Sequence, residues 1–296
     1  MNALLNQKNR APLAFAVMAL LLLGVGMGQS WPFALAILNL CLISAIMSLG
    51  VNIQWGYAGL LNLGVMGFTA LGGLAAVLVS EAPVLEAWSV GGQGMVVSFI
   101  LVVITIVLAI LVYRNMAASW QRRLTLTGLF IGAYFVINHF YAPAVYAIEN
   151  VDPATYGFLG GMGMPVIFSW VLGGIMAAGV AWVIGKITLG LRSDYLAIAT
   201  LGISEIIIAV LKNEDWLARG VKNVAGLDRP VPFELNLQNT PWFIDLVTSL
   251  FSGRLSALAD AQRTEALQQL VIQSSSIFVK LCYTGLFTVV LVVVLL

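Results

Sequence analysis

Long apolar segments follow one another along most of the chain, and they restrict its possible folds more than any other feature. A helix needs about 20 apolar residues to cross a bilayer core about 30 Å thick. Such segments lie at 11–28, 32–50, 57–79, 95–113, 124–141, 164–185, 195–211 and 276–296. The sequence therefore predicts an all-α fold, a polytopic transmembrane helical bundle of about eight spans in a single domain, 1–296.

Composition agrees with a surface that lipid covers. Of the 296 residues, 60% are apolar and 9% are charged, whereas soluble domains carry about 25% charged residues. The net charge is +1 and no basic run occurs, so we expect no nucleic-acid partner. Cys41 and Cys282 lie in apolar segments, and His139 is the one histidine of the sequence. We therefore predict no disulfide framework, no metal site and no cofactor.

The N-terminal segment resembles a secretory signal, because Lys8 and Arg10 precede an apolar stretch from 11 to 27. No clear cleavage site follows, and another apolar segment begins at Trp31. We interpret the segment as an uncleaved first span.

Charges in the loops predict the orientation. A cytoplasmic N-terminus places seven basic residues on the cytoplasmic side, whereas the opposite short loops, 29–31, 80–94 and 142–163, contain none. The seven are Lys8, Arg10, Arg114, Arg122, Arg123, Lys186 and Arg192. Cytoplasmic loops carry an excess of Lys and Arg, so the sequence predicts a cytoplasmic N-terminus.

Residues 213–275 are then predicted to form an extracytoplasmic loop. The apolar spacing from Leu255 to Ile272 favours an amphipathic helix that lies against the membrane or the protein.

Glu205 is the one acidic residue deep within a predicted span. A carboxylate costs a few kcal/mol there, so such residues usually face a bundle interior or a wet cavity. Two interpretations stay open. Glu205 makes structural or inter-subunit hydrogen bonds, or it lines a substrate path.

A second polar region lies at 50–73, within otherwise apolar sequence. Gln54, Trp55, Tyr57 and Asn62 supply hydrogen-bonding groups and are candidates for the substrate path. Neighbouring glycines allow either a broken helix that lines a cavity or tight helix packing. The glycines that we assign to packing or a hinge are Gly56, Gly59, Gly64 and Gly67. A broken or re-entrant segment is expected at 50–64.

The sequence does not match two motifs of soluble enzymes, the phosphate loop and the nucleophile elbow. Between Gly179 and Lys186 the glycine spacing is one residue too long for a phosphate loop, and Ile187 stands where Ser or Thr is needed. The stretch 202–206 lacks the closing glycine of a nucleophile elbow. We predict no catalytic residue and no enzyme activity, and we expect His139 to serve helix packing or the membrane interface. Transport against a gradient would need an ion gradient or a separate ATPase.

Two sequence stretches resemble a known family. Residues 50–70, GVNIQWGYAGLLNLGVMGFTA, are similar to the early signature of branched-chain amino acid ABC permeases. Residues 191–207, LRSDYLAIATLGISEII, resemble the second signature of the LivM-type subunit, and Asn213-Glu-Asp-Trp216 follows at a similar spacing.

This resemblance implies a multi-pass permease subunit in the bacterial inner membrane. Its expected partners are a LivH-type permease subunit, two cytoplasmic ABC ATPase subunits and a periplasmic substrate-binding protein. The implied substrates are leucine, isoleucine, valine or related amino acids, and urea and short-amide importers share much of the pattern. The family also has a cytoplasmic coupling helix after the span at 276–296. Because this sequence ends at Leu296, we expect it to be a C-terminally truncated permease.

Two other functions are alternatives for a chain of this kind. An ion-coupled secondary carrier predicts inverted repeats and ion-binding residues in the membrane, but no clear repeat is visible. A membrane-embedded enzyme needs a metal cluster or a catalytic dyad, and the sequence shows neither.

Overall fold

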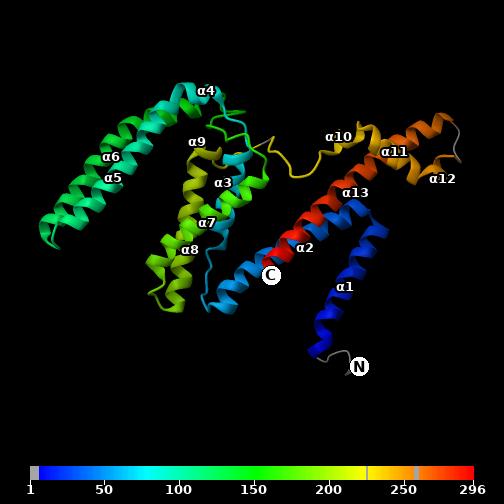
Figure 1. The fold of residues 1–296 in the computed structure, drawn as a ribbon, viewed down its shortest axis with the longest axis horizontal. Coiled ribbons are helices and arrows are strands. Elements are labelled where there is room, and N and C mark those ends of the chain that lie inside the picture. The colour runs from blue at the N-terminus through cyan, green and yellow to red at the C-terminus, as the bar shows by residue number, and fades with distance from the viewer. Residues whose placement is uncertain (1–6, 225, 257–259) are drawn as a thin grey trace. The chain divides into compact units, whose positions relative to one another are not determined.

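The computed structural model describes residues 7–224, 226–256 and 260–296, and these ranges contain helices and loops without a β-strand (Figure 1). Seven helices of the described residues are long and apolar enough to cross a membrane. They lie at Ala11–Gly28, Trp31–Tyr57, Leu85–Asn115, Trp120–Glu149, Ile167–Thr188, Ser193–Asn213 and Gln262–Leu295. The prediction of an all-α, multi-pass membrane protein is confirmed.

The span predicted at 57–79 differs from the other seven. Its helix, α3 (Val65–Ser80), has 16 residues and begins only after a non-helical stretch. Polar side chains and glycines before Val65 favour turns over helix, so the apolar helix there is shorter than hydropathy predicts.

The chain divides into two compact units. Unit 1 comprises Met1–Leu60 and Arg229–Leu296, and unit 2 comprises Leu61–Asp228. Each unit has its own buried cluster.

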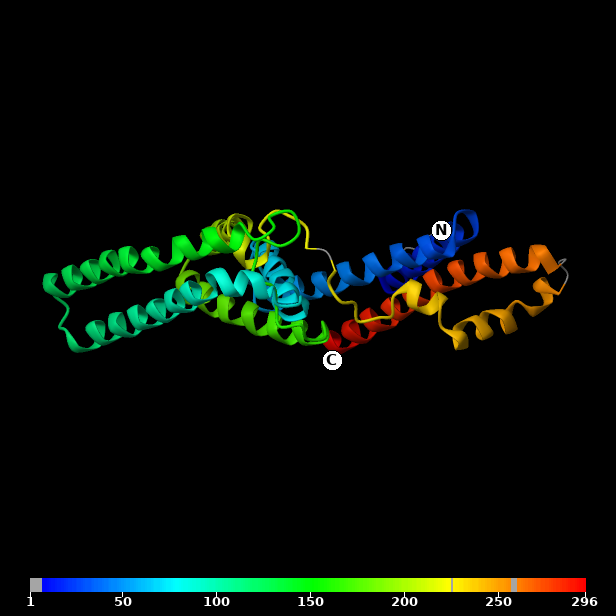
Figure 2. The same ribbon diagram turned by 90° about the horizontal axis from the view of Figure 1, so that it is seen from above.

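Unit 1 is organised around α2 (Trp31–Asn52) and α13 (Asp260–Leu295), with α1 (Gln7–Gly28) packed on α2. Helices α2 and α13 lie side by side and run in the same direction (Figures 1 and 2). Asn39 of α2 is buried between them. Its Nδ2 donates to the carbonyl of Lys280 over 3.1 Å, and its Oδ1 accepts from Thr284 Oγ1 over 2.7 Å. Such polar bonds between apolar helices fix their register.

Three short helices cover part of α13. They are α10 (Glu234–Gln238), α11 (Pro241–Leu250) and α12 (Ser252–Leu255). Phe243 and Val247 of α11 are buried in a cluster with Val271 and Val279 of α13. The stretch 255–272, expected to be an amphipathic helix, ends α12 and begins α13, and 257–259 lie outside the described residues. Its apolar spacing therefore continues into a membrane span.

Unit 2 combines a packed group of three helices with a long helical hairpin (Figure 1). Helix α3 packs on α7 (Ile167–Thr188) and α8 (Ser193–Asn213). The hairpin consists of α5 (Gln93–Asn115) and α6 (Trp120–Glu149), preceded by α4 (Leu85–Ala87) and the π-helical turn η2 (Trp88–Gly92). The buried cluster of this unit is Val77, Val84, Ala87, Met95, Ile148, Phe158 and Leu159.

A buried arginine holds the loops at one end of unit 2. Arg219 follows α9 (Asp215–Ala218) in a left-handed conformation, φ 61°. Its guanidinium donates to the carbonyls of Asn223 and Ala154, each over 2.7 Å. These bonds join the segment after α9 to the loop after α6.

Glu81, directly after α3, lies in surroundings that disfavour the charge of its carboxylate. One of its carboxylate oxygens is buried and has no hydrogen-bond partner within the described part of the chain. Burial raises the pKa of the Glu81 carboxyl, Asp228 raises it further, and Arg219 opposes the rise. The fold therefore disfavours the charged form of Glu81 relative to the same carboxylate in water.

Glu81→Gln tests this interpretation. A raised carboxyl pKa means that the folded state binds the proton more tightly than the unfolded state, so stability falls as pH rises above the ordinary pKa of 4.5. The amide resembles the protonated acid. We expect Glu81→Gln to unfold at a higher temperature than the parent protein at neutral pH, and this gain should shrink on acidification.

Thermal unfolding in detergent across acidic to neutral pH measures the effect. Glu86→Gln, which neutralises an exposed carboxylate on α4, is the control and should change little. A lower unfolding temperature for Glu81→Gln at neutral pH would show that the charge stabilises the fold.

Candidate functional site

A break in the helix separates α2 from α3. Helix α2 ends in the π-helical turn η1 (Ile53–Tyr57), and residues 58–64 are not helical. The amide of Ala58 donates to the carbonyl of Ile53 over 3.2 Å, and that of Leu60 donates to the carbonyl of Gln54 over 2.9 Å. Gly59 has φ +66°, which lets the chain leave the helix. The prediction of a broken segment at 50–64 is confirmed.

The candidate residues before Leu61 belong to unit 1. Trp55 and Tyr57 extend outward from that unit, with 62% and 85% of their surfaces exposed. Gln54 is half-buried. Gly56 and Gly59 are exposed and lie within or just after the π-helical turn.

Beyond the break, side chains bind the backbone amides at the start of α3. Thr200 Oγ1 of α8 accepts from the amide of Leu63 over 3.2 Å. Ser204 Oγ of α8 accepts from the amide of Gly67 over 2.8 Å. Asn62 Oδ1 accepts from the amide of Gly64 over 2.8 Å. The first amides of a helix have no partner within it, and here α8 and Asn62 supply partners.

Gly64 and Gly67 allow this contact because they lack a side chain. A Cβ at Gly64 would lie 2.6 Å from the carbonyl oxygen of Thr200. A Cβ at Gly67 would lie 2.9 Å from Ser204 Oγ and 3.1 Å from Ser204 Cα. The two interpretations of this region, a break and tight packing, thus apply to different glycines. Gly59 lies in the break, and Gly64 and Gly67 form the packing contact.

Glu205 follows Ser204 on α8 but faces away from α3. Leu196, Ala197, Thr200 and Ser204 are buried, whereas Glu205 is exposed. Within the described part of the chain Glu205 forms no salt bridge. An exposed carboxylate within a span is costly against lipid. This surface of α8 therefore requires a polar partner or water when the protein is in a membrane.

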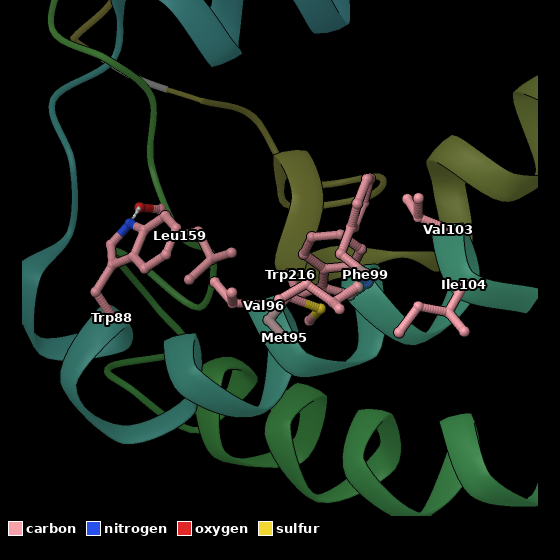
Figure 3. Close-up of a pocket in the computed structure, with 9 residues that line it drawn as sticks. Trp88, Met95, Val96, Phe99, Val103, Ile104, Leu159 and Trp216 are labelled. Atoms are coloured by element: carbon pink, nitrogen blue, oxygen red, sulfur yellow. Dashed lines mark hydrogen bonds between the residues drawn. The ribbon is translucent and has the colours of Figure 1, made fainter. Parts of the chain in front are cut away.

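Unit 2 also contains an apolar cavity of about 560 Å³ that is open to the surface (Figure 3). It is lined by Trp88, Met95, Val96, Phe99, Ile100, Val103, Ile104, Leu159 and Trp216. The indole N–H of Trp88 already donates to the carbonyl of Leu159 over 3.0 Å, as Figure 3 shows. A charged ligand would find no partner in this lining, and burying an unpaired charge is very costly. The cavity suits hydrocarbon.

Trp216, which lines this cavity, forms hydrogen bonds with Tyr141 and Glu214 that sequence reasoning did not predict. The Tyr141 hydroxyl donates to Glu214 Oε2, and Trp216 Nε1 donates to the same oxygen over 2.6 Å. Trp216 Nε1 also lies 2.9 Å from the Tyr141 hydroxyl. Together they attach α9 to α6. The 213–216 motif marked Glu214 and Trp216, but no local pattern connects them with Tyr141, 73 residues earlier.

Thr200 and Ser204 were missed as well. Their four-residue spacing places both hydroxyls on one face of α8, and this spacing was the available signal. Its partner could not be read from the sequence, since the bonds to Leu63 and Gly67 span 137 residues.

Comparison with curated proteins finds a partial similarity. The chain is 36% identical over 69 residues to the high-affinity branched-chain amino acid transport system permease protein LivM of Escherichia coli (strain K12). The matched stretch covers 23% of this chain and 16% of the length of LivM. No family model matches the chain. No solved structure matches it either.

The contact between α3 and α8 gives a testable prediction. We expect Gly67→Ala to lower the free energy of unfolding by about 1–3 kcal/mol, because the added methyl group overpacks the contact with Ser204. Gly73→Ala, on the same helix, is the matched control, since a Cβ there meets no atom within 4 Å. It should be neutral or stabilise the protein by about 0.5–1 kcal/mol.

Denaturant unfolding in mild detergent, followed by circular dichroism, compares the two variants. Equal stability of Gly67→Ala and Gly73→Ala would contradict a close approach of α3 to α8.

Proposed function

We propose that this chain is a LivM-type permease subunit of an ATP-binding cassette importer for branched-chain amino acids. In this proposal it forms the translocation path with a second, LivH-type permease subunit. The observation that carries the proposal is the 36% identity with LivM over 69 residues. Seven candidate spans in the described residues and a helix broken at 58–64 are compatible with a permease.

The chemistry of the substrate restricts where its path runs. A branched-chain amino acid carries an ammonium, a carboxylate and an apolar side chain. The apolar cavity of unit 2 offers no partner for either charge. At the start of α3 the amides of Leu63, Gly64 and Gly67 already donate to side chains. These three amides are therefore not available to bind the carboxylate of the substrate.

The proposed path is therefore lined by the polar groups that face outward or flank the break. Glu205 on α8 is one of them, and its carboxyl is a suitable acceptor for an ammonium or for a hydrogen bond from the second subunit. The other candidates are those proposed from the sequence, Gln54, Trp55 and Tyr57 within unit 1 and Asn62 within unit 2.

The energy for import is proposed to come from two cytoplasmic ATPase subunits, because this sequence contains no phosphate loop. A periplasmic binding protein would deliver the substrate, and the complex would lie in the bacterial inner membrane. The chain itself would catalyse no reaction.

Uptake by the complete transporter tests the proposal. The gene that encodes this chain and the genes of its partner subunits would be expressed in cells that lack leucine uptake. We expect uptake of tritiated leucine that isoleucine and valine compete for. A hydrolysis-deficient ATPase subunit should abolish this uptake.

Each other outcome rejects a specific part of the proposal. Competition by urea or short amides, but not by isoleucine, would assign the chain to an amide importer of the same family. Uptake that persists with the inactive ATPase and collapses with a protonophore would identify an ion-coupled carrier.

Glu205 gives a second prediction for the same assay. Glu205→Gln keeps the hydrogen-bonding capacity, so we expect it to retain most of the uptake. Glu205→Leu removes it. Leaving a buried partner unsatisfied costs about 1–3 kcal/mol, which corresponds to a loss of about 5- to 150-fold. Glu86→Gln is the control for neutralising an exposed carboxylate.

Assembly with the other subunits is measured by co-purification for each variant. Complete loss of uptake in a normally assembled Glu205→Gln transporter would show that the negative charge is needed, and would overturn the role as a hydrogen-bonding group.

A further inference from the structure

Helix α11 of unit 1 carries apolar residues that the described part of the chain covers only in part. Trp242, Leu246 and Leu250 are 53%, 41% and 70% exposed. Their spacing of four residues aligns them on one flank of the helix. Asp245 and Ser249 are also exposed. At about 100° per residue, Asp245 lies about 100° from the centre of this stripe, whereas Ser249 borders the stripe beside Trp242. The helix therefore exposes an apolar stripe next to its buried face, with Asp245 on the far side of the stripe.

The remaining face of α11 fixes its position along α13. Phe243 and Val247 of α11 are buried in the cluster that includes Val271 and Val279. The ring of Phe278 lies 5.7 Å from that of Phe243 and 6.2 Å from that of Trp242, measured between centroids. Helix α11 therefore lies beside residues 271–279 of α13.

That position coincides with one boundary of the apolar part of α13. The helix has 36 residues, which at 1.5 Å per residue span about 54 Å, more than the roughly 30 Å of a bilayer core. The apolar segment occupies 276–296, whereas 260–275 includes charged and polar residues such as Arg263, Glu265, Gln268 and Gln269. The helix thus leaves the membrane close to residue 276.

Helix α2 gives the same boundary independently. Asn39 is level with Lys280 and Thr284 through its two hydrogen bonds. Trp31 precedes Asn39 by eight residues, and α2 and α13 run in the same direction (Figures 1 and 2). Trp31 is therefore level with residues 272–276 of α13. It begins the apolar span directly after the turn at Gln29, and tryptophan is typical of membrane interfaces.

We infer that α11 lies in the membrane interface, with Trp242, Leu246 and Leu250 inserted at the boundary between headgroups and acyl chains. Asp245 faces water in this arrangement, and Ser249 lies between Asp245 and the inserted stripe. Asp245 is the one charged residue of α11, so binding relies on apolar area and not on attraction to anionic lipid. This placement depends on unit 1 alone and holds whatever the protein transports.

Spin labels on the two flanks of α11 test the inference. Single cysteines would replace Leu246, Leu250 or Asp245 in a chain whose Cys41 and Cys282 are changed to alanine, reconstituted in phosphatidylcholine nanodiscs. Collisions of each nitroxide with oxygen, which concentrates in lipid, and with a water-soluble nickel chelate are then measured. We expect several-fold higher oxygen access and several-fold lower nickel access at 246 and 250 than at 245.

The outcomes separate lipid from the other possible covers. Equal nickel access at 245 and 250 would place both flanks in water and overturn the inference. Protection of 246 and 250 from both reagents would show that protein covers the stripe, which also overturns it. Replacing part of the phosphatidylcholine by phosphatidylglycerol should leave the pattern unchanged, and a contrast that appears only with the anionic lipid would contradict apolar insertion.

Trp242 provides a second measurement on a chain with its native cysteines. Brominated acyl chains quench tryptophan fluorescence on contact. We expect Trp242→Phe to lose part of the quenching seen for the parent protein, and an unchanged quenched fraction would overturn the inference without relying on a cysteine variant that misfolds.

Discussion

Backbone amides and carbonyls that leave a helix within a bilayer find no water, so the protein itself must supply their partners. This requirement governs the break between α2 and α3. On the α2 side, the amides of Ala58 and Leu60 donate hydrogen bonds to carbonyls of the π-helical turn. On the α3 side, the amides of Leu63 and Gly67 are bound by Thr200 and Ser204 of α8. The broken helix is possible because a neighbouring helix presents two hydroxyl groups at the right height.

That bonding arrangement determines which way Glu205 faces. Successive residues of an α-helix are rotated by about 100°, at 3.6 residues per turn. Ser204 must face α3 to reach the amide of Gly67, and only glycines at 64 and 67 let the helices approach closely enough. Glu205, one residue later, is then directed away from α3 and out of unit 2. Glu205 is therefore exposed because the hydrogen bond from the Gly67 amide holds Ser204 toward α3.

The sequence predicted the features that depend on local composition, and it failed where position depends on distant contacts. Seven of the predicted spans follow from apolar runs, and the break at 58–64 follows from clustered Gly, Asn and Gln, whereas the length of α3 was overestimated. The direction in which Glu205 faces was not predictable, because the hydrogen bonds of Thr200 and Ser204 that orient α8 against α3 join residues 137 apart in the sequence. The apolar spacing at 255–272 was real, but it could not show that residues after 260 continue into a span. Helix α11 was overlooked because its ten residues are too short to be recognised by hydropathy.

Unit 2 has two kinds of exposed surface. One is apolar and can contact hydrocarbon, and the other contains a carboxyl group and needs a polar partner or water. The cavity beside Trp88 and Trp216 suits hydrocarbon, since the N–H groups of both indoles are already engaged within the protein. The exposed face of α8 around Glu205 does not, because a carboxyl against lipid lacks any partner. A zwitterionic amino acid has the opposite requirement from lipid, as it needs partners for two charges. On the proposed function, the substrate and the second subunit would therefore meet this chain along α8, and lipid tails would occupy the cavity.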